Sequence, residues 1–303
     1  MTQNRQGVLS AIGAYIIWGL LPIYWKFLSD VGSIEIMVNR IIWSCISTII
    51  VLLLIKQGTQ LKRDIVQLWQ HKKQFFSLFA ASLFISVNWF IYIWAVNNDY
   101  LYQTSLGYYI NPLISVLFGV VFFKERLTPS TWIAVSLATI GVLAMTISSG
   151  QVPFIALILA VSFGIYGVLK KRVQLDATRG LAIETLFLLP FALVGYIVLS
   201  WNEPPMLFTG DATTVTLLLL SGVVTAVPLI LFATAAQRIP LILLGFIQYL
   251  SPSIVLLLGL FVYNEPFTTA ELIGFSAIWA AIVIFSVGNI MATQRMKRQQ
   301  EVK

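Results

Sequence analysis

Ten long apolar stretches dominate this chain and restrict it to very few folds. Each holds about 20 predominantly apolar residues, the length that an α-helix needs to cross the hydrocarbon core of a bilayer. A segment in lipid must satisfy its own backbone hydrogen bonds, so we expect every stretch to be a helix. The stretches are 7–28, 34–55, 74–97, 101–123, 129–148, 152–169, 180–200, 213–236, 241–263 and 269–290.

The balance of side chains excludes a soluble fold. Hydrophobic residues make up 58% of the chain and charged residues only 10%, whereas a soluble domain carries roughly 25% charged residues. The connections are short except 56–73 and 201–212, which we interpret as loops. No soluble domain with its own chemistry fits between the stretches.

Basic residues gather at alternate ends of the stretches. With the N-terminus placed in the cytoplasm, the inner segments hold nearly all the Lys and Arg, and Lys26 is the nearest outer case. This bias predicts an even number of spans with both termini cytoplasmic. The net charge of +7 is therefore a sign of membrane orientation, and we expect no nucleic-acid partner because the basic residues form no patch with stacking aromatics.

Cofactor chemistry finds no support in the sequence. Cys45 and His71 are the single cysteine and histidine, too few for a disulfide or a zinc site. The chain has no Walker loop, Rossmann glycine fingerprint or metalloprotease motif. We expect no cofactor, no metal and no catalytic residues.

The chain also repeats itself at about half its length, which is typical of membrane transporters. The first copy runs Tyr109-Ile-Asn-Pro112, Gly119, Glu125, Thr128, and the second, at matching offsets, Tyr249-Leu-Ser-Pro252, Gly259, Glu265, Thr268. Five spans per copy make the second copy enter from the opposite side. We therefore expect an all-α integral membrane protein of ten transmembrane helices, built as two inverted five-helix repeats, 1–148 and 149–303.

An inverted repeat gives a mechanism. When the two halves exchange conformations, a site near the midplane opens to one side and then to the other. A second set of matching residues pairs Trp18-Gly19 and Lys26 with Phe163-Gly164 and Lys171. This alignment of the two copies places Arg40 opposite Glu184.

Arg40 and Glu184 are charges about six residues, or roughly 9 Å, inside their spans. Such residues usually face a cavity or a partner. Arg40 is a candidate anchor for an anionic or carboxylate-bearing solute; the alternative is a structural ion pair or snorkelling to the interface. Glu184 is a candidate for binding a cationic group or a coupling proton; the alternative is an ion pair with Arg179 or Lys171.

Polar and aromatic residues deep in other spans complete the candidate site. Buried amides in lipid need partners, either another helix or a ligand, and a proline frees a backbone carbonyl near the midplane. The candidate binding residues are Asn88, Trp89 and Tyr92; Tyr108 and Asn111; Gln248 and Tyr249; and Trp43. The candidate hinges are Pro112, Pro228 and Pro252, of which Pro228 predicts a break in the eighth span.

Other residues of these types have structural interpretations. Trp25, Trp69 and Trp201 lie near span ends and are expected to anchor the interface. Glu125 and Glu265 precede Thr128 and Thr268, which can cap the next helix, so this group indicates turn chemistry.

Several segments also resemble a known family. They are Trp18-Gly-Leu-Leu-Pro-Ile-Tyr-Trp-Lys26, Asn39-Arg40-Ile-Ile-Trp-Ser44, Asn88-Trp89, Ile93-Trp-Ala-Val-Asn-Asn98, Ser105-Leu-Gly-Tyr-Tyr-Ile-Asn-Pro112, Ile183-Glu-Thr185 and Leu244-Gly-Phe-Ile-Gln-Tyr249. Over nearly the whole chain they are similar to the RarD branch of the EamA family, in the drug/metabolite transporter superfamily. The resemblance implies ten helices in inverted repeats in the bacterial inner membrane, and export or exchange of metabolites such as amino acids, without naming a solute or coupling ion.

Taken together, these features predict a secondary transporter that moves a small organic solute by alternating access. Its partners would be the solute, the lipid bilayer and a proton or counter-solute as the coupling species. The oligomeric state stays open. The alternatives are a membrane scaffold or partner subunit without transport, a membrane-embedded enzyme and a channel.

Overall fold

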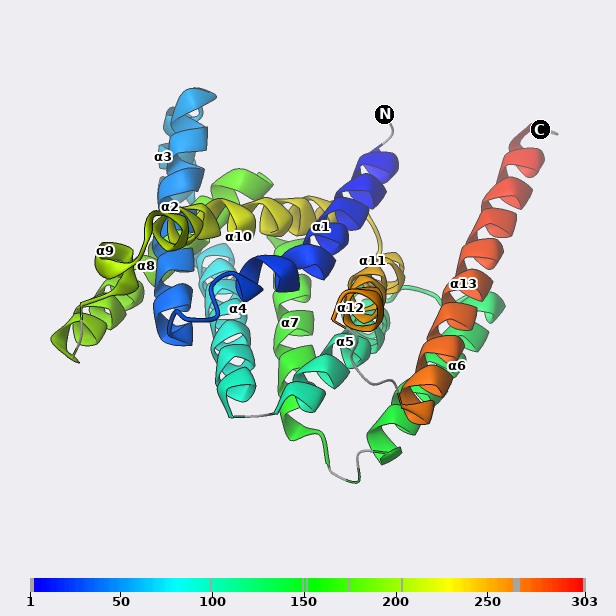
Figure 1. Cartoon of the computed structure of the whole chain (residues 1–303). Coiled ribbons are helices and arrows are strands. Elements are labelled where there is room, and N and C mark those ends of the chain that lie inside the picture. Colours follow the sequence, from blue (N-terminus) through cyan, green and yellow to red (C-terminus); the bar gives the residue numbers. More distant parts are fainter. Residues whose placement is uncertain are drawn as a thin grey trace.

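The computed structural model describes residues 3–98, 100–148, 150, 152–173, 175–202, 204–263 and 268–301, and every regular element within them is an α-helix (Figure 1). The helices are α1 (Gln3–Lys26), α2 (Ser33–Leu54), α3 (Gly58–Gln70), α4 (Lys72–Asn97), α5 (Leu101–Phe123), α6 (Pro129–Ser148), α7 (Phe154–Arg172), α8 (Ala177–Asn202), α9 (Met206–Thr209), α10 (Ala212–Arg238), α11 (Leu241–Gln248), α12 (Leu250–Phe261) and α13 (Thr269–Glu301). Ten segments are long and apolar enough to cross a membrane, and each falls on a predicted stretch.

The two connections interpreted as loops contain helices. In α3, Leu61, Ile65 and Leu68 share one face and pack in a cluster with Leu78 of α4, while the opposite face is polar. This i, i+4, i+7 spacing is the ordinary sign of an amphipathic helix, and the polar composition hid it. The second connection contains the short α9.

Proline has different effects in the candidate hinge helices. The ninth span is interrupted at Tyr249, so that α11 ends and α12 begins just before Pro252. Pro112 lies within the continuous α5. Pro228 likewise lies within the uninterrupted α10, so the predicted break of the eighth span is wrong. Neighbouring helices can satisfy the carbonyl that a membrane proline frees, which is how such a helix continues.

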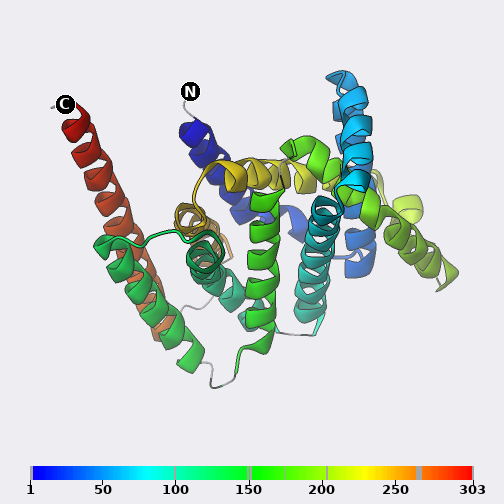
Figure 2. The same cartoon turned by 180° about the vertical axis from the view of Figure 1, so that it is seen from behind.

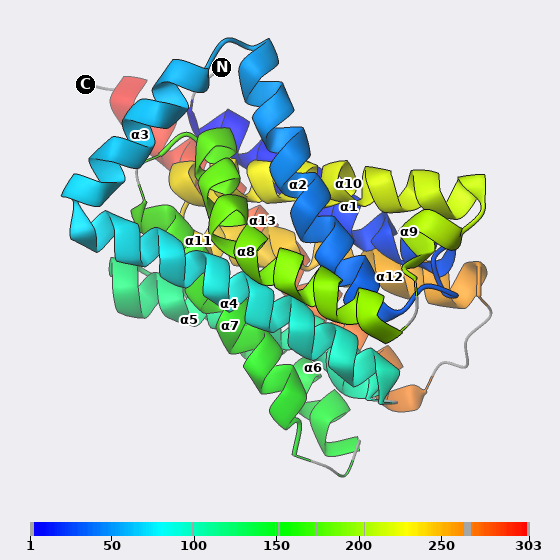
Figure 3. The same ribbon diagram turned by 90° about the vertical axis from the view of Figure 1, so that its left-hand side faces the viewer.

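The helices form a central bundle with a pair of helices at its side. α6 and α13 pack along each other at one side of the bundle, as the two opposite views show (Figures 1 and 2), and α13 contacts α5 through Phe275 and Tyr109. In the bundle, α5 packs on α7 and α11, and α1 packs on α10 and α12. α2 packs between α8 and α10, as the side view shows (Figure 3).

Glycine allows one especially close helix crossing. A Cβ on Gly222 of α10 would lie 2.1 Å from the carbonyl carbon of Trp43 on α2. The Ser44 hydroxyl donates to the carbonyl of Gly222 at 3.0 Å, so the two backbones meet directly. Small residues at membrane helix interfaces permit this kind of approach.

The helix ends are capped largely as predicted. The Thr128 hydroxyl accepts from the amide of Thr131 at 3.2 Å, and Thr268 forms a reciprocal capping box with Glu271. Asp211 caps α10 by accepting from the Thr214 amide at 2.9 Å, and this hydrogen bonding with Thr214 lowers the pKa of its carboxyl. Glu265 lies outside the described residues.

Candidate functional site

Arg40 lies at the centre of an aromatic cluster that three helices build. Its guanidinium carbon is 4.7 Å from the ring centre of Trp25, on α1, and 4.7 Å from that of Trp89, on α4. Its Nε donates to the hydroxyl of Thr225, on α10, at 3.0 Å. The planar cation is therefore held by two ring contacts and one hydrogen bond, a geometry that suits Arg better than Lys.

The charge of Arg40 has no acidic partner in the part of the chain that the structure describes. Among the described residues no carboxylate lies within ion-pair distance of it. The hydroxyls of Tyr24, Tyr92 and Tyr108 are close enough for direct electrostatic interaction. A cation inside a membrane span is expensive unless it is paired or hydrated, so this cluster can accept an anion.

Tyr92 and Tyr108 join the same cluster. Their rings meet edge to face at 5.9 Å between centres. Tyr108 lies inside the apolar span Gln103–Phe123, yet it keeps 39% of its surface exposed. Its ring faces Tyr92 and its hydroxyl interacts electrostatically with Arg40, so Tyr108 joins α5 to the Arg40 cluster.

The side-chain nitrogens of Asn88 and Trp43 donate hydrogen bonds to other groups of the protein. The Asn88 amide donates to the carbonyl of Leu159 at 2.8 Å and to the hydroxyl of Ser162 at 3.0 Å, which ties α4 to α7. The Trp43 indole donates to the side chain of Asn39 on its own helix at 3.1 Å. For Asn88 the partner is thus another helix, one of the two alternatives that its burial left open.

Asn111, Gln248 and Tyr249 lie along a second polar strip where α5 faces α11. Gln248 accepts from the Ser115 hydroxyl at 3.2 Å. The side-chain oxygen of Asn111 and the hydroxyl of Tyr249 are buried without a hydrogen-bond partner in the described structure. A Cβ on Gly245 would come within 2.8 Å of the carbonyl of Pro112, so α5 packs directly on α11 at this candidate hinge.

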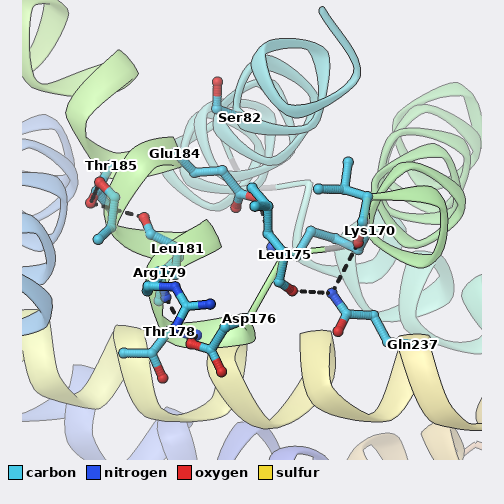
Figure 4. Close-up of polar contacts among 12 residues, drawn as sticks. Ser82, Lys170, Leu175, Asp176, Thr178, Arg179, Leu181, Glu184, Thr185 and Gln237 are labelled. Carbon is cyan, nitrogen blue, oxygen red and sulfur yellow. Dashed lines mark hydrogen bonds and ion pairs between the residues drawn. The ribbon is translucent and has the colours of Figure 1, made fainter. Parts of the chain in front are cut away.

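Glu184 forms an ion pair with Lys170 beside the α7–α8 turn (Figure 4). The Nζ atom of Lys170 lies 2.6 Å from Oε1 of Glu184, and each side chain is only 2% exposed. The second carboxylate oxygen of Glu184 and the hydroxyl of Tyr166 are buried without a hydrogen-bond partner among the described residues. The alternative prediction, that Glu184 pairs with Arg179 or Lys171, is wrong, because the partner is Lys170.

Those two basic residues instead join separate segments at the same end of the molecule. Arg179 donates to Asp64 of α3 at 2.6 Å. Lys171 donates to the carbonyl of Ile239 at 2.5 Å and lies 3.8 Å from Glu125. In Figure 4, Gln237 of α10 bridges to the α7–α8 turn, where it donates to the carbonyl of Leu175 at 2.9 Å.

Glu125 was predicted to have a structural role in a turn, and it also binds the start of another helix. Its two oxygens accept from the amides of Leu241 and Ile242, at 2.8 and 2.9 Å, and so cap the start of α11. The carboxylate suits this position because the N-terminus of a helix carries partial positive charge. Glu125 therefore connects the end of α5 to a helix in the other half of the chain.

Sequence reasoning missed Trp25, Thr225 and Lys170. Trp25 was interpreted as an interface anchor, and Lys170 was counted among the basic residues at the inner membrane surface. Thr225 lies in the apolar stretch 213–236, and its position three residues before Pro228 was the available signal.

Comparison with known proteins identifies a family. The model of the EamA-like transporter family matches residues 5–147 and again residues 152–287. An "Uncharacterized transporter YojE" of Bacillus subtilis is 44% identical over 95% of this chain and 96% of its own length. "Protein RarD" of Escherichia coli is 37% identical over 98% of this chain and 99% of its own length.

The fold also has a solved counterpart. A crystal structure that is 18% identical in sequence superposes with a TM-score of 0.71 and covers 92% of this chain and 96% of its own. At this identity the likeness shows the fold alone.

Proposed function

Because the chain belongs to the RarD branch of the EamA-like transporter family, we propose that it is a secondary transporter of the bacterial inner membrane. It moves a small organic solute by export or exchange through alternating access. The ten membrane-spanning segments make it a multi-pass membrane protein, and both chain ends lie on the same side in Figure 1. We assign that side to the cytoplasm from the bias of basic residues.

Two inverted five-helix repeats, 1–148 and 149–303, underlie this mechanism. Their support comes from pairs of equivalent contacts: where a residue of the first half touches the second half, the equivalent residue of the second half touches the first in the same way. Gly19 packs on Ile254 and Gly164 packs on Ile114, with the glycine Cβ positions at 2.8 and 2.6 Å from those side chains. The family model's separate match to each half points the same way.

A second set of equivalent contacts involves lysine and an aromatic ring. Lys26 lies 3.9 Å from the ring centre of Tyr263, and Lys171 lies 5.3 Å from that of Phe123. Each lysine follows the shared glycine by the same spacing, and each ring ends the fourth span of the opposite half. Contacts that repeat across the halves are what an exchange of conformations between them requires.

The unpaired charge of Arg40 is the observation that carries the assignment of the solute site. We propose that the solute presents an anionic group to Arg40, with Trp89, Tyr92 and Tyr108 lining the approach. Asn111, Gln248 and Tyr249 continue the path, while Trp43 and Asn88 hold its walls. Pro112 and Pro252 act as hinges; Pro228 is a weaker candidate because α10 runs through it unbroken.

Exchange of radiolabelled solutes in proteoliposomes tests the proposal. The panel contains organic anions, zwitterionic amino acids and organic cations. We expect anions to cross faster than in empty liposomes, and Arg40→Ala to abolish that flux. Arg63→Ala is the matched control, because Arg63 is exposed on α3.

The outcomes separate the rival functions. No flux of any solute contradicts the transporter assignment and favours a scaffold or partner subunit. Flux that survives Arg40→Ala contradicts the site. Chemical conversion of a solute without its movement favours a membrane enzyme.

A further inference from the structure

We propose that Glu184 is a proton-binding site that couples a proton to the transport cycle, with Lys170 as its internal counter-ion. The inference rests on the proposed function but concerns a second site, which is separate from the Arg40 cluster. It is carried by three observations: an enclosed ion pair, a carboxylate oxygen of that pair without a hydrogen-bond partner in the described structure, and a phenol close to the carboxyl.

Enclosure is the first observation. Glu184 and Lys170 are 1% and 2% exposed. The ring centre of Tyr166, which stacks on Phe232, lies 5.9 Å from the ammonium of Lys170. Taking both charges out of water costs more than their attraction usually returns, so apolar residues serve stability as well or better. A buried pair of this kind indicates a role other than stability.

The unused oxygen is the second observation. Lys170 contacts only Oε1 of Glu184, while Oε2 is buried without a hydrogen-bond partner in the described structure. A buried acceptor without a donor is costly. A proton on Oε2 turns this oxygen into a hydroxyl that can donate to a neighbouring acceptor, and it removes the negative charge from the enclosed carboxyl.

The third observation is the position of Tyr166. Its hydroxyl lies close to the Glu184 carboxyl and is itself buried without a hydrogen-bond partner among the described residues. A phenol both donates and accepts, so it can serve the carboxyl in either protonation state. This gives the site two stable forms.

The other helices around Glu184 place few charges near it. α2 contributes Cys45, beside Thr185. α3 contributes Asp64, which is engaged by Arg179. From α10, Arg238 donates to the carbonyl of Thr234, and the described part of α4 nearest the site contributes the neutral Ser82. Lys170 and Tyr166 of α7 are thus the groups that control the proton.

A conformational consequence follows from charge balance. When a proton from water binds Glu184, the carboxylate becomes neutral and the ammonium of Lys170 loses its counter-charge. Lys170 is two residues from the end of α7 at Arg172, so its flexible chain can carry the charge to the membrane surface. The contact between α7 and α8 then breaks at the end that Gln237 and Lys171 join to α10.

Infrared titration of the full-length protein in lipid nanodiscs tests proton binding directly. We expect the C=O stretch of a protonated, water-shielded carboxyl to grow as the pH falls from alkaline to mildly acidic. This band should be absent in Glu184→Gln, shifted in Tyr166→Phe and retained in the control Glu271→Gln. Identical titrations of wild type and Glu184→Gln overturn the proposal.

A second variant keeps the test independent of folding. The double change Lys170→Met with Glu184→Met removes both charges together, so it should keep the wild-type melting temperature, while Lys170→Met alone should lower it. In proteoliposomes the double variant should carry solute without moving protons. Wild-type solute flux that leaves an internal pH dye unchanged contradicts this inference but leaves the proposed function intact.

Discussion

At the scale of single residues, Arg40 shows how ring contacts and one hydrogen bond can hold a cation inside a membrane span. Two indole rings lie 4.7 Å from the guanidinium, and Thr225 fixes its Nε. Each cation–π contact is worth about 0.5–2 kcal/mol. These contacts hold the charge in place without neutralising it, so its counter-charge can come from the solute.

The geometry predicts that charge alone does not suffice at position 40. Arg40→Lys keeps the positive charge but loses the planar contact with both indoles and the hydrogen bond to Thr225. We expect anion flux to fall at least about tenfold, which corresponds to about 1.4 kcal/mol. Arg63→Lys, on the exposed face of α3, should transport normally. Wild-type flux in Arg40→Lys means that the aromatic contacts do not contribute.

The two charged residues were predictable, whereas their partners were not. Arg40 and Glu184 stand out because a charge inside an apolar run is costly and therefore rare. Lys170 and Lys171 are adjacent in sequence, yet one is buried against Glu184 and the other contacts the end of α10. Helix packing decides which lysine turns inward, and the sequence does not contain that information locally.

At the scale of helices, apolar length and helix caps determine most of what is observed. All ten spans were predictable because lipid permits only helices of a minimum length. The sequence does not distinguish Pro252, where a break lies just upstream at Tyr249, from Pro228, where the helix continues. That difference depends on which neighbouring groups take over the freed carbonyl.

The crossing of α2 and α10 yields a prediction at this scale. In Gly222→Ala the new methyl group meets the backbone of Trp43 at 2.1 Å, and backbone cannot move aside as a side chain can. We expect a loss of about 1–3 kcal/mol, measured as a lower melting temperature in detergent. Gly167→Ala is the control, because its Cβ would lie 3.5 Å from Phe232. Equal melting temperatures for the two variants would show that the crossing is not tight.

At the scale of the whole molecule, polar contacts join the two halves within the spans, as between Arg40 and Thr225, and also at both ends of the bundle. At the end assigned to the cytoplasm, Arg179 binds Asp64, and Glu125 caps α11. At the opposite end, Glu35 accepts from the amide of Leu207 at 3.1 Å. The repeat was visible in the sequence, but the residues that join the halves at these two ends were not, because they come from helix ends and the connections between helices.

Alternating access requires these end contacts to open in turn, which a cross-link can prevent. We expect Asp64→Cys with Arg179→Cys, made in a Cys45→Ser background, to lose exchange when a short cleavable thiol cross-linker joins α3 to α8. Exchange should return after reduction. The matched control is Lys62→Cys with Lys73→Cys, since these exposed residues lie within one half at the same end. Undiminished exchange in the cross-linked Asp64→Cys/Arg179→Cys protein would mean that this end does not open during transport.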